Sequence, residues 1–123
     1  MKPWLFITAI NGALAVAAGA FAAHGLKAWL DPGALSVFET GARYHMYHAL
    51  AMGLAALAGR GPARGYARTA ACLFLAGIIL FSGSLYLLAL TGIPLLGIIT
   101  PVGGVAFLAG WAALARAAWK LEP

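Results

Sequence analysis

Histidine, tyrosine and hydroxyl side chains occur in this sequence inside long apolar stretches, and these are the groups that could do chemistry. His45 and His48 are three residues apart, so a helix presents both imidazoles and the neighbouring Tyr44 phenol on one face. Such imidazoles can bind a metal, relay a proton or hydrogen-bond to another helix. Residues from other segments complete the candidates for a binding pocket: His24, Ser82, Ser84, Tyr86 and Thr100.

Metal binding and catalysis find little support among these residues. His24 could add a third nitrogen to those of His45 and His48, but no cysteine or second acidic cluster completes a ligand set. Cys72 is the single cysteine and lies within an apolar run, which excludes an intramolecular disulfide. The sequence has no nucleophile elbow, phosphate-binding loop or paired carboxylates. We therefore predict no catalytic residue, no metal and no cofactor, and a metal-dependent membrane enzyme is the least favoured interpretation.

The composition indicates which elements must hold these side chains. Of 123 residues, 63% are hydrophobic and only 9% are charged, and the mean hydropathy is +0.92. These charges are too few to cover a soluble globule of this size, which excludes an ordinary cytosolic enzyme. The net charge of +5 comes from basic residues scattered singly between apolar stretches, which argues against nucleic-acid binding. The predicted partner is the lipid bilayer.

Four segments are long and apolar enough to cross a bilayer, because about 20 residues of helix span its hydrocarbon core. We predict an all-α integral membrane protein whose residues 1–123 form one four-helix transmembrane domain. The second span must begin near Thr40 if it is to cross, which brings Arg43, His45 and His48 into the bilayer. The predicted spans are residues 4–23, 40–58, 70–90 and 96–115.

The basic residues at the ends of these spans predict the orientation, since lysine and arginine are retained on the cytoplasmic side. With both termini cytoplasmic, only Lys27 and Arg43 lie outside. The basic residues inside are then Lys2, Arg60, Arg64, Arg68, Arg116 and Lys120. Ala18-Gly19-Ala20 resembles a signal-peptide cleavage site. We expect the first span to be retained, because its apolar run is longer than a signal core and its removal would leave three spans with the termini on opposite sides.

Counting along the spans places the polar side chains in the outer half of the membrane. His48 lies about 16 Å from the inner boundary, near the midplane, and Ser82 and Ser84 lie about 18 and 21 Å from it. The inner half is apolar apart from Asn11. For His48, a binding site and interhelical hydrogen bonding are equally supported, whereas for the hydroxyls hydrogen bonding is favoured. We expect His24, at the membrane edge, to order a loop.

Charged and small residues make two further patterns. Glu39 and Arg43 are four residues apart on the second span and predict a structural ion pair, with Tyr47 below it. On the first span Ala15 and Gly19 begin a stripe of small residues that suits close packing against another helix. Tryptophans are expected near the inner interface: Trp4, Trp111 and Trp119.

Four ordered motifs closely resemble the YgdD-like family of small inner-membrane proteins. The motifs are residues 23–27 (AHGLK), 40–48 (Thr-Gly through Tyr44 to His48), 81–86 (FSGSLY), and 100–104 (TPVGG) with 107–111 (FLAGW). The resemblance runs over nearly the whole chain. It implies four spans, a multi-pass location in the bacterial inner membrane and retention of the first span, and it implies no particular reaction, since that family has no established biochemical function.

Residue by residue, the resemblance covers most of the candidate pocket. The matching positions are His24, Gly25, Tyr44, His48, Ser82, Gly83, Ser84, Tyr86, Thr100, Pro101, Gly103 and Gly104. His45 departs from the family pattern, in which other polar residues such as glutamine follow the tyrosine. This departure weakens a mechanism that needs both histidines and favours a pocket built around His48.

The sequence therefore predicts a non-enzymatic binding or accessory protein with a small polar pocket in the outer half of the bilayer. In this hypothesis His48 is the central hydrogen-bonding group, Tyr44 and Tyr86 flank it, and the hydroxyls line the wall. Glycines let the helices approach closely: Gly83, Gly103 and Gly104. A bundle of this size encloses little volume alone, so we also expect a homo-oligomer. The alternative is a conduit for protons or a small solute, centred on His48.

Overall fold

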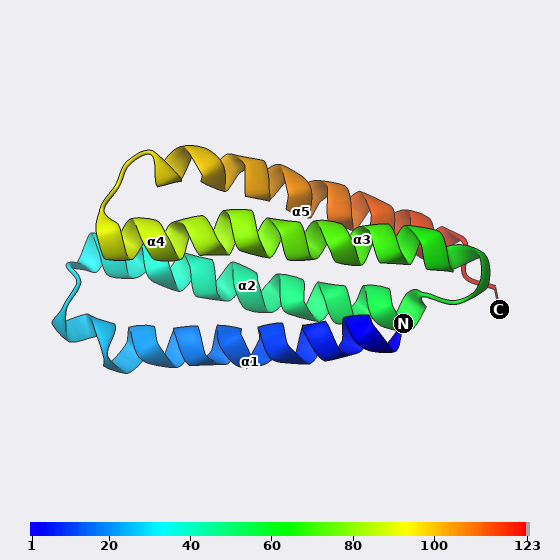
Figure 1. Cartoon of the computed structure of the whole chain (residues 1–123), viewed down its shortest axis with the longest axis horizontal. Coiled ribbons are helices and arrows are strands. Elements are labelled where there is room, and N and C mark those ends of the chain that lie inside the picture. The colour runs from blue at the N-terminus through cyan, green and yellow to red at the C-terminus, as the bar shows by residue number, and fades with distance from the viewer. Residues whose placement is uncertain (123) are drawn as a thin grey trace.

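The computed structural model describes residues 1–122, which form long helices lying side by side (Figure 1). The α-helices are α1 (Lys2–His24), α2 (Pro32–Ala58), α3 (Arg64–Gly77), α4 (Gly83–Thr91) and α5 (Leu96–Trp119). A π-helical segment, Ile78–Ser82, joins α3 and α4 into one rod. Short 3-10 turns, Leu26–Ala28 and Gly61–Ala63, lie between α1 and α2 and between α2 and α3. The two termini lie at the same end of the molecule (Figure 1).

Local sequence explains where the helices begin and end. The Asp31 side chain accepts a hydrogen bond of 2.8 Å from the Ala34 amide, and Pro32 is the first helical residue, so α2 starts well before Thr40. α4 ends at Thr91 and is capped by Gly92, whose φ of +68° lies in the left-handed region that glycine adopts without strain. All four predicted spans fall inside observed helices, and the helices extend beyond them.

The all-helical architecture agrees with the sequence analysis, whereas the number of membrane spans is not fixed by hydropathy alone. Within residues 1–122, three helical stretches are long and apolar enough to cross a membrane: Lys2–Ala28, Gly61–Thr91 and Leu96–Trp119. The remaining long helix, α2, has 27 residues but carries the histidines and the Glu39 and Arg43 charges. α2 is therefore the helix whose relation to the bilayer needs a separate argument.

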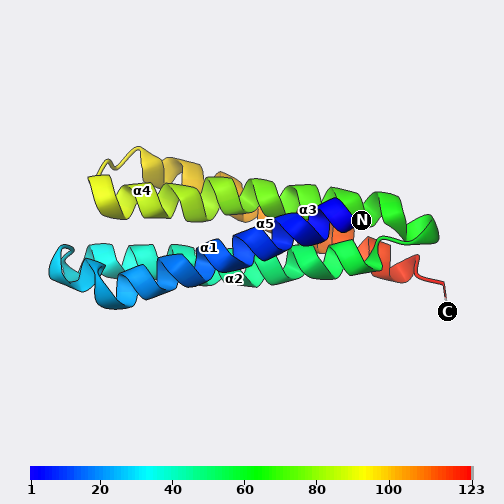
Figure 2. The same cartoon turned by 60° about the horizontal axis from the view of Figure 1, so that its bottom comes forward.

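α2 is the central helix of the bundle. It packs against α1 on one side and against the α3–α4 rod on the other, while α5 packs along that rod. Figure 2 shows α1 inclined to α2. Alanines let the helices come close around a few large side chains, of which Met52 and Phe74 are fully buried. The main core consists of Ala51, Met52, Ala55, Ala70, Ala71, Phe74, Ile78 and Phe107.

Close helix contacts depend on particular glycines. A Cβ atom on Gly103 would collide with the backbone of Leu80 and Phe81 in the π-helical segment. Of the glycines predicted to permit close packing, Gly103 is thus required. Gly83 and Gly104 are not, because a Cβ on either would meet its nearest atom only at 3.9 Å. The sequence analysis missed Gly77 and Gly110, which lie against the rings of Phe107 and Phe74.

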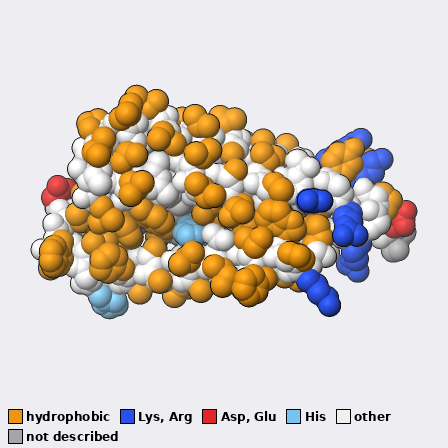
Figure 3. Space-filling view, viewed as in Figure 1, with side chains coloured by type: hydrophobic (Ala, Val, Ile, Leu, Met, Phe, Trp, Pro, Cys, Tyr) orange, Lys and Arg blue, Asp and Glu red, His pale blue; other side chains and the backbone are white. Residues whose placement is uncertain are grey.

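Charge is distributed unevenly along the molecule. Lysine and arginine side chains gather at the end that carries the termini, and apolar side chains cover the length of the bundle (Figure 3). Large apolar residues such as Phe6, Ile98 and Leu108 are between 68% and 71% exposed. Such a surface suits hydrocarbon and would be unusual in water.

Candidate functional site

His48 lies at the centre of an aromatic cluster between α2, α3 and α5. Its ring stacks on Phe107 with centroids 3.5 Å apart and planes within 7° of parallel. The Nδ1–H group donates to the Tyr44 carbonyl oxygen at 2.7 Å. The indole N–H of Trp111 donates to Nε2 at 3.2 Å. These partners define the neutral tautomer protonated at Nδ1, and they occupy both ring nitrogens.

A groove of about 400 Å³ opens beside this cluster. Its lining is almost entirely carbon and belongs to α2, the π-helical segment and α5. The residues are Tyr44, Tyr47, His48, Phe81, Gly104, Phe107, Leu108 and Trp111. Tyr44 and His48 of the predicted pocket are therefore brought together, but the cavity between them is aromatic and apolar where a polar one was expected.

His45 belongs to a different cluster, which joins three helices. The Asn11 amide nitrogen donates to the Ile7 carbonyl at 2.9 Å, so the Asn11 oxygen faces His45 and accepts from Nε2–H at 3.1 Å. Nδ1 of the neutral imidazole then accepts a hydrogen bond from the Tyr86 hydroxyl group at 2.9 Å. A continuous chain of hydrogen bonds thus runs from Tyr86 on α4, through His45 on α2, to Asn11 on α1. His45 is only 5% exposed, so this chain is buried.

The hydroxyl residues form a third arrangement. The hydroxyl oxygens of Ser84 and Thr100 lie 2.6 Å apart, and this hydrogen bond joins α4 to α5. The Ser84 hydroxyl also lies 2.9 Å from the carbonyl oxygen of Phe81, to which it donates a hydrogen bond. Ser82 is fully buried, and its hydroxyl has no hydrogen-bond partner among residues 1–122. None of these hydroxyls lines the aromatic groove. The predicted single pocket is thus divided into three separate clusters around His48, His45 and Ser84.

The outermost candidates stay apart from these clusters. His24 ends α1 and is exposed. Arg43 donates to the Thr40 hydroxyl at 3.2 Å, and the part of the chain that is described contains no ion pair between Arg43 and Glu39. Both charged residues border a separate groove between α1 and α2.

Three contributors to these clusters were missed from the sequence. Trp111 was expected near the inner interface, and the sequence analysis did not predict its contact with His48. Phe107 stacks on that histidine, and Asn11 pairs with His45. Phe107 and Trp111 are four residues apart on α5, so they share a helix face, and this spacing was the available signal. Asn11 was recognised as the one polar residue of the inner half, but its partner depends on how α1 and α2 pack.

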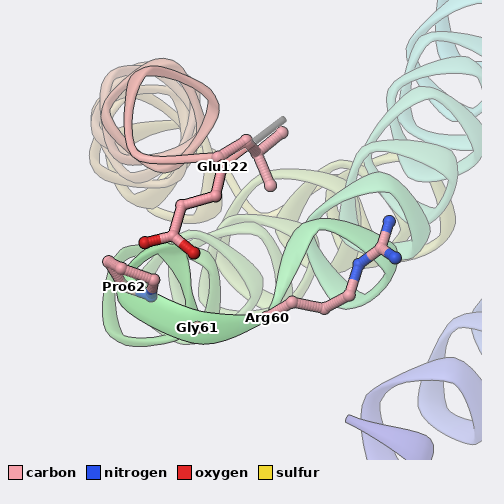
Figure 4. Close-up of a pocket in the computed structure, with 5 residues that line it drawn as sticks. Arg60, Gly61, Pro62 and Glu122 are labelled. Atoms are coloured by element: carbon pink, nitrogen blue, oxygen red, sulfur yellow. The ribbon is translucent and has the colours of Figure 1, made fainter.

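A pocket of about 350 Å³ lies at the end that carries the termini (Figure 4). Arg60, Gly61, Pro62, Leu121 and Glu122 line it. In Figure 4 the Glu122 carboxylate points toward Pro62, while the Arg60 side chain points away from it. This pocket contains none of the predicted site residues. Across residues 1–122 no three His, Cys, Asp or Glu side chains come together as a metal site.

Comparison with known proteins connects this arrangement to a family. A profile described as "Protein of unknown function (DUF423)" matches residues 18–104. The UPF0382 membrane protein YwdK of Bacillus subtilis (strain 168) is 50% identical over 98% of both chains. The UPF0382 membrane protein SAB0533 of Staphylococcus aureus (strain bovine RF122 / ET3-1) is 45% identical over 98% of both chains. A UPF0382 membrane protein of Haemophilus influenzae is 44% identical over 95% of this chain and 94% of its own. No solved structure matches the chain significantly.

Proposed function

This chain belongs to the DUF423 family of proteins of unknown function, whose curated relatives are UPF0382 membrane proteins, and from that premise we propose a specific role. The protein is a four-span, non-enzymatic binding protein of the bacterial inner membrane, with both termini in the cytoplasm. It binds a lipid-soluble molecule in the aromatic groove beside His48. The inner membrane and the relation to the YgdD-like family rest on the resemblance of the sequence motifs.

The four-span arrangement is supported by the place of α2 in the bundle. Its 27 residues make a rod of about 40 Å, enough to cross the hydrocarbon core. His45 and His48 are each 5% exposed, so α2 turns its imidazoles toward the other helices and away from lipid. A helix whose polar groups are satisfied by its neighbours can cross a bilayer despite a modest hydropathy.

The orientation is supported by the position of the basic residues. Arg60, Arg64 and Arg68 lie at the same end of the bundle as the termini, where lysine and arginine gather (Figure 3). Positive charge is retained on the cytoplasmic side during insertion. We therefore propose that this end lies in the cytoplasm, and that Gly92 and the turn after it lie outside.

The single observation that carries the binding role is the groove of about 400 Å³. His48 offers no free nitrogen to it, because Tyr44 and Trp111 occupy both. What remains is the faces and edges of aromatic rings, which favour an apolar chain or a flat ring. Leu108 on the rim is 71% exposed, so the groove is open toward the hydrocarbon region of a surrounding bilayer. A molecule dissolved in lipid can therefore enter from the side.

A proton conduit is less well supported by the geometry. His48 donates to a backbone carbonyl and accepts from an indole, and neither partner exchanges protons near neutral pH. The chain through His45 ends at the Asn11 amide and the Ile7 carbonyl, which likewise cannot pass a proton on. Both histidines thus hold helices together in this structure, and we favour binding over conduction.

The test fills the groove without disturbing His48. Leu108→Trp places a large ring in the groove, whereas Val102→Trp adds the same ring on the opposite face of α5, where Val102 is 58% exposed. We expect native mass spectrometry of the wild type to show a bound lipid-soluble mass that Leu108→Trp loses and Val102→Trp retains. A wild type without any bound mass, or a bound mass kept equally by both variants, would rule out the groove as the binding site.

A further inference from the structure

A second groove, between α1 and α2, carries opposite charges that the fold leaves unpaired with each other. It measures about 380 Å³ and is lined by Ala15, Gly19, Glu39, Ala42, Arg43 and Met46. Glu39 and Arg43 are both exposed, and they lie four residues apart on one side of α2. In Figure 1, α1 and α2 form the lower edge of the bundle, with no helix of the chain beyond α1 among those drawn.

The charges are in an unfavourable position for a helix that faces lipid. Counting outward from Ala58 at about 1.5 Å per residue, Arg43 lies about 22 Å along α2 and Glu39 about 28 Å, near the outer limit of the hydrocarbon. Charged groups at such depth normally pair or face protein. Among residues 1–122, the Thr40 hydroxyl at 3.2 Å is the hydrogen-bond partner of the Arg43 guanidinium.

The glycines of α1 add an independent observation. A Cβ atom on Gly12 or Gly19 would meet nothing within 4 Å, in contrast to Gly41 and Gly53, where neighbouring side chains lie at 3.0 Å. Glycine destabilises the interior of a helix relative to alanine. The packing of one copy therefore gives no reason for glycine at these two positions, while a close approach of a second helix does.

We propose that this face, made of Gly12, Ala15, Gly19, Glu39 and Arg43, is the interface between two copies of this chain. A two-fold axis along the membrane normal brings Arg43 of each copy within reach of Glu39 of the other, since the two positions differ by one helical turn. Two reciprocal ion pairs result, as an isologous interface requires. The glycines allow the backbones to approach. This proposal is independent of a ligand in the groove beside His48.

A second copy fits the face better than an anionic lipid does. An anionic headgroup would pair with Arg43 but would be repelled by Glu39, whereas the same face turned through the two-fold axis satisfies both charges. A zwitterionic headgroup with a primary amine also carries both charges, so the experiment must separate that ligand from a second copy. Phosphatidylcholine vesicles, which contain no primary amine, make this separation.

The experiment measures dimerisation of the full chain in phosphatidylcholine vesicles by energy transfer between donor-labelled and acceptor-labelled copies. We expect the wild type to dimerise and Glu39→Arg or Arg43→Glu to weaken self-association at least tenfold, which corresponds to about 1.4 kcal/mol. A mixture of Glu39→Arg copies with Arg43→Glu copies should dimerise again, because opposite charges then face each other across the interface. Only direct contact between copies predicts this rescue.

Substitutions on α1 give the matched control for the packing. Gly19→Leu should weaken dimerisation, whereas Ala17→Leu, an exposed position on another side of α1, should not. Both variants should keep the helical circular dichroism of the wild type. The proposal is overturned by a monomeric wild type, by a dimer indifferent to all of these changes, or by charge variants that fail to rescue each other in the mixture. Monomers that bind phosphatidylethanolamine only when both charges are present would identify a lipid site.

Discussion

His45 shows how one side chain can join helices that are far apart in the sequence. It lies between the Tyr86 hydroxyl and the Asn11 amide oxygen, at 2.9 and 3.1 Å. Both partners have polar atoms inside the bundle that would otherwise lack water and a hydrogen bond. Leaving such a group without a hydrogen bond lowers the stability of the folded protein more than removing both partners together does.

We therefore expect His45→Leu to lower the free energy of unfolding by about 1–3 kcal/mol. The double variant His45→Leu/Asn11→Leu should lose less than the sum of the two single changes, because it leaves no orphaned amide oxygen. Unfolding in mixed detergent micelles, followed by circular dichroism, measures all the variants. His24→Leu is the control, since His24 is exposed and its replacement should change stability by less than about 0.5 kcal/mol. Strictly additive losses would show that His45 and Asn11 do not interact.

The sequence grouped Ser84 with Thr100 correctly, but it did not predict the partners of most other polar side chains. Ser84 and Thr100 were expected at similar depth on neighbouring spans, and they lie 2.6 Å apart. Depth needs only the rise of a helix, whereas a contact also needs the rotation of each helix about its axis. Trp111 illustrates the difference, because counting along the span gives an expected depth but not the rotation of α5 that turns this residue toward His48.

At the scale of elements, the π-helical segment Ile78–Ser82 determines how α5 packs. The extra residue in each turn of this segment widens the α3–α4 rod and brings the backbone of Leu80 and Phe81 against Gly103. The hydropathy pattern predicted this rod as one apolar span, but it did not predict the π-helical turn within it. The long apolar helices follow from composition, while such local departures follow from contacts between helices.

We expect Gly103→Ala to destabilise the protein by about 1–3 kcal/mol, because the added methyl group meets backbone atoms that cannot rotate away. Gly97→Ala on the same helix is the matched control, since its Cβ would meet only the Leu88 side chain at an ordinary 3.8 Å. There the better helix propensity of alanine should leave stability equal or higher. The same detergent unfolding assay compares the two variants. Equal stability in both would mean that α5 does not need the close approach at Gly103.

At the scale of the whole molecule, the position of α2 distinguishes an arrangement of four membrane spans from one of three. Three helical stretches of the described chain are long and apolar enough to cross a membrane, and α2 is not among them. If α2 lay on the membrane surface, it would have to leave both α1 and the α3–α4 rod, against which it packs along the bundle. The buried contacts of His45 and His48 would then be lost as well. This packing therefore supports the proposal that α2 crosses the membrane beside the other helices.

The number of membrane spans determines whether the two termini lie on the same side of the membrane. Four spans leave both termini on one side, whereas three spans leave them on opposite sides. We expect a fluorescent protein that matures only in the cytoplasm to be bright when fused to either terminus of the full chain. Fused instead after Gly92, with α5 removed, it should be dark, because the turn after α4 lies outside. If only one of the two full-length fusions is bright, α2 does not span the membrane, and the packing of His45 and His48 must be described anew. Equal brightness at both termini together with a dark fusion after Gly92 fits four spans, because the basic end of the bundle is then cytoplasmic, as positive charge requires.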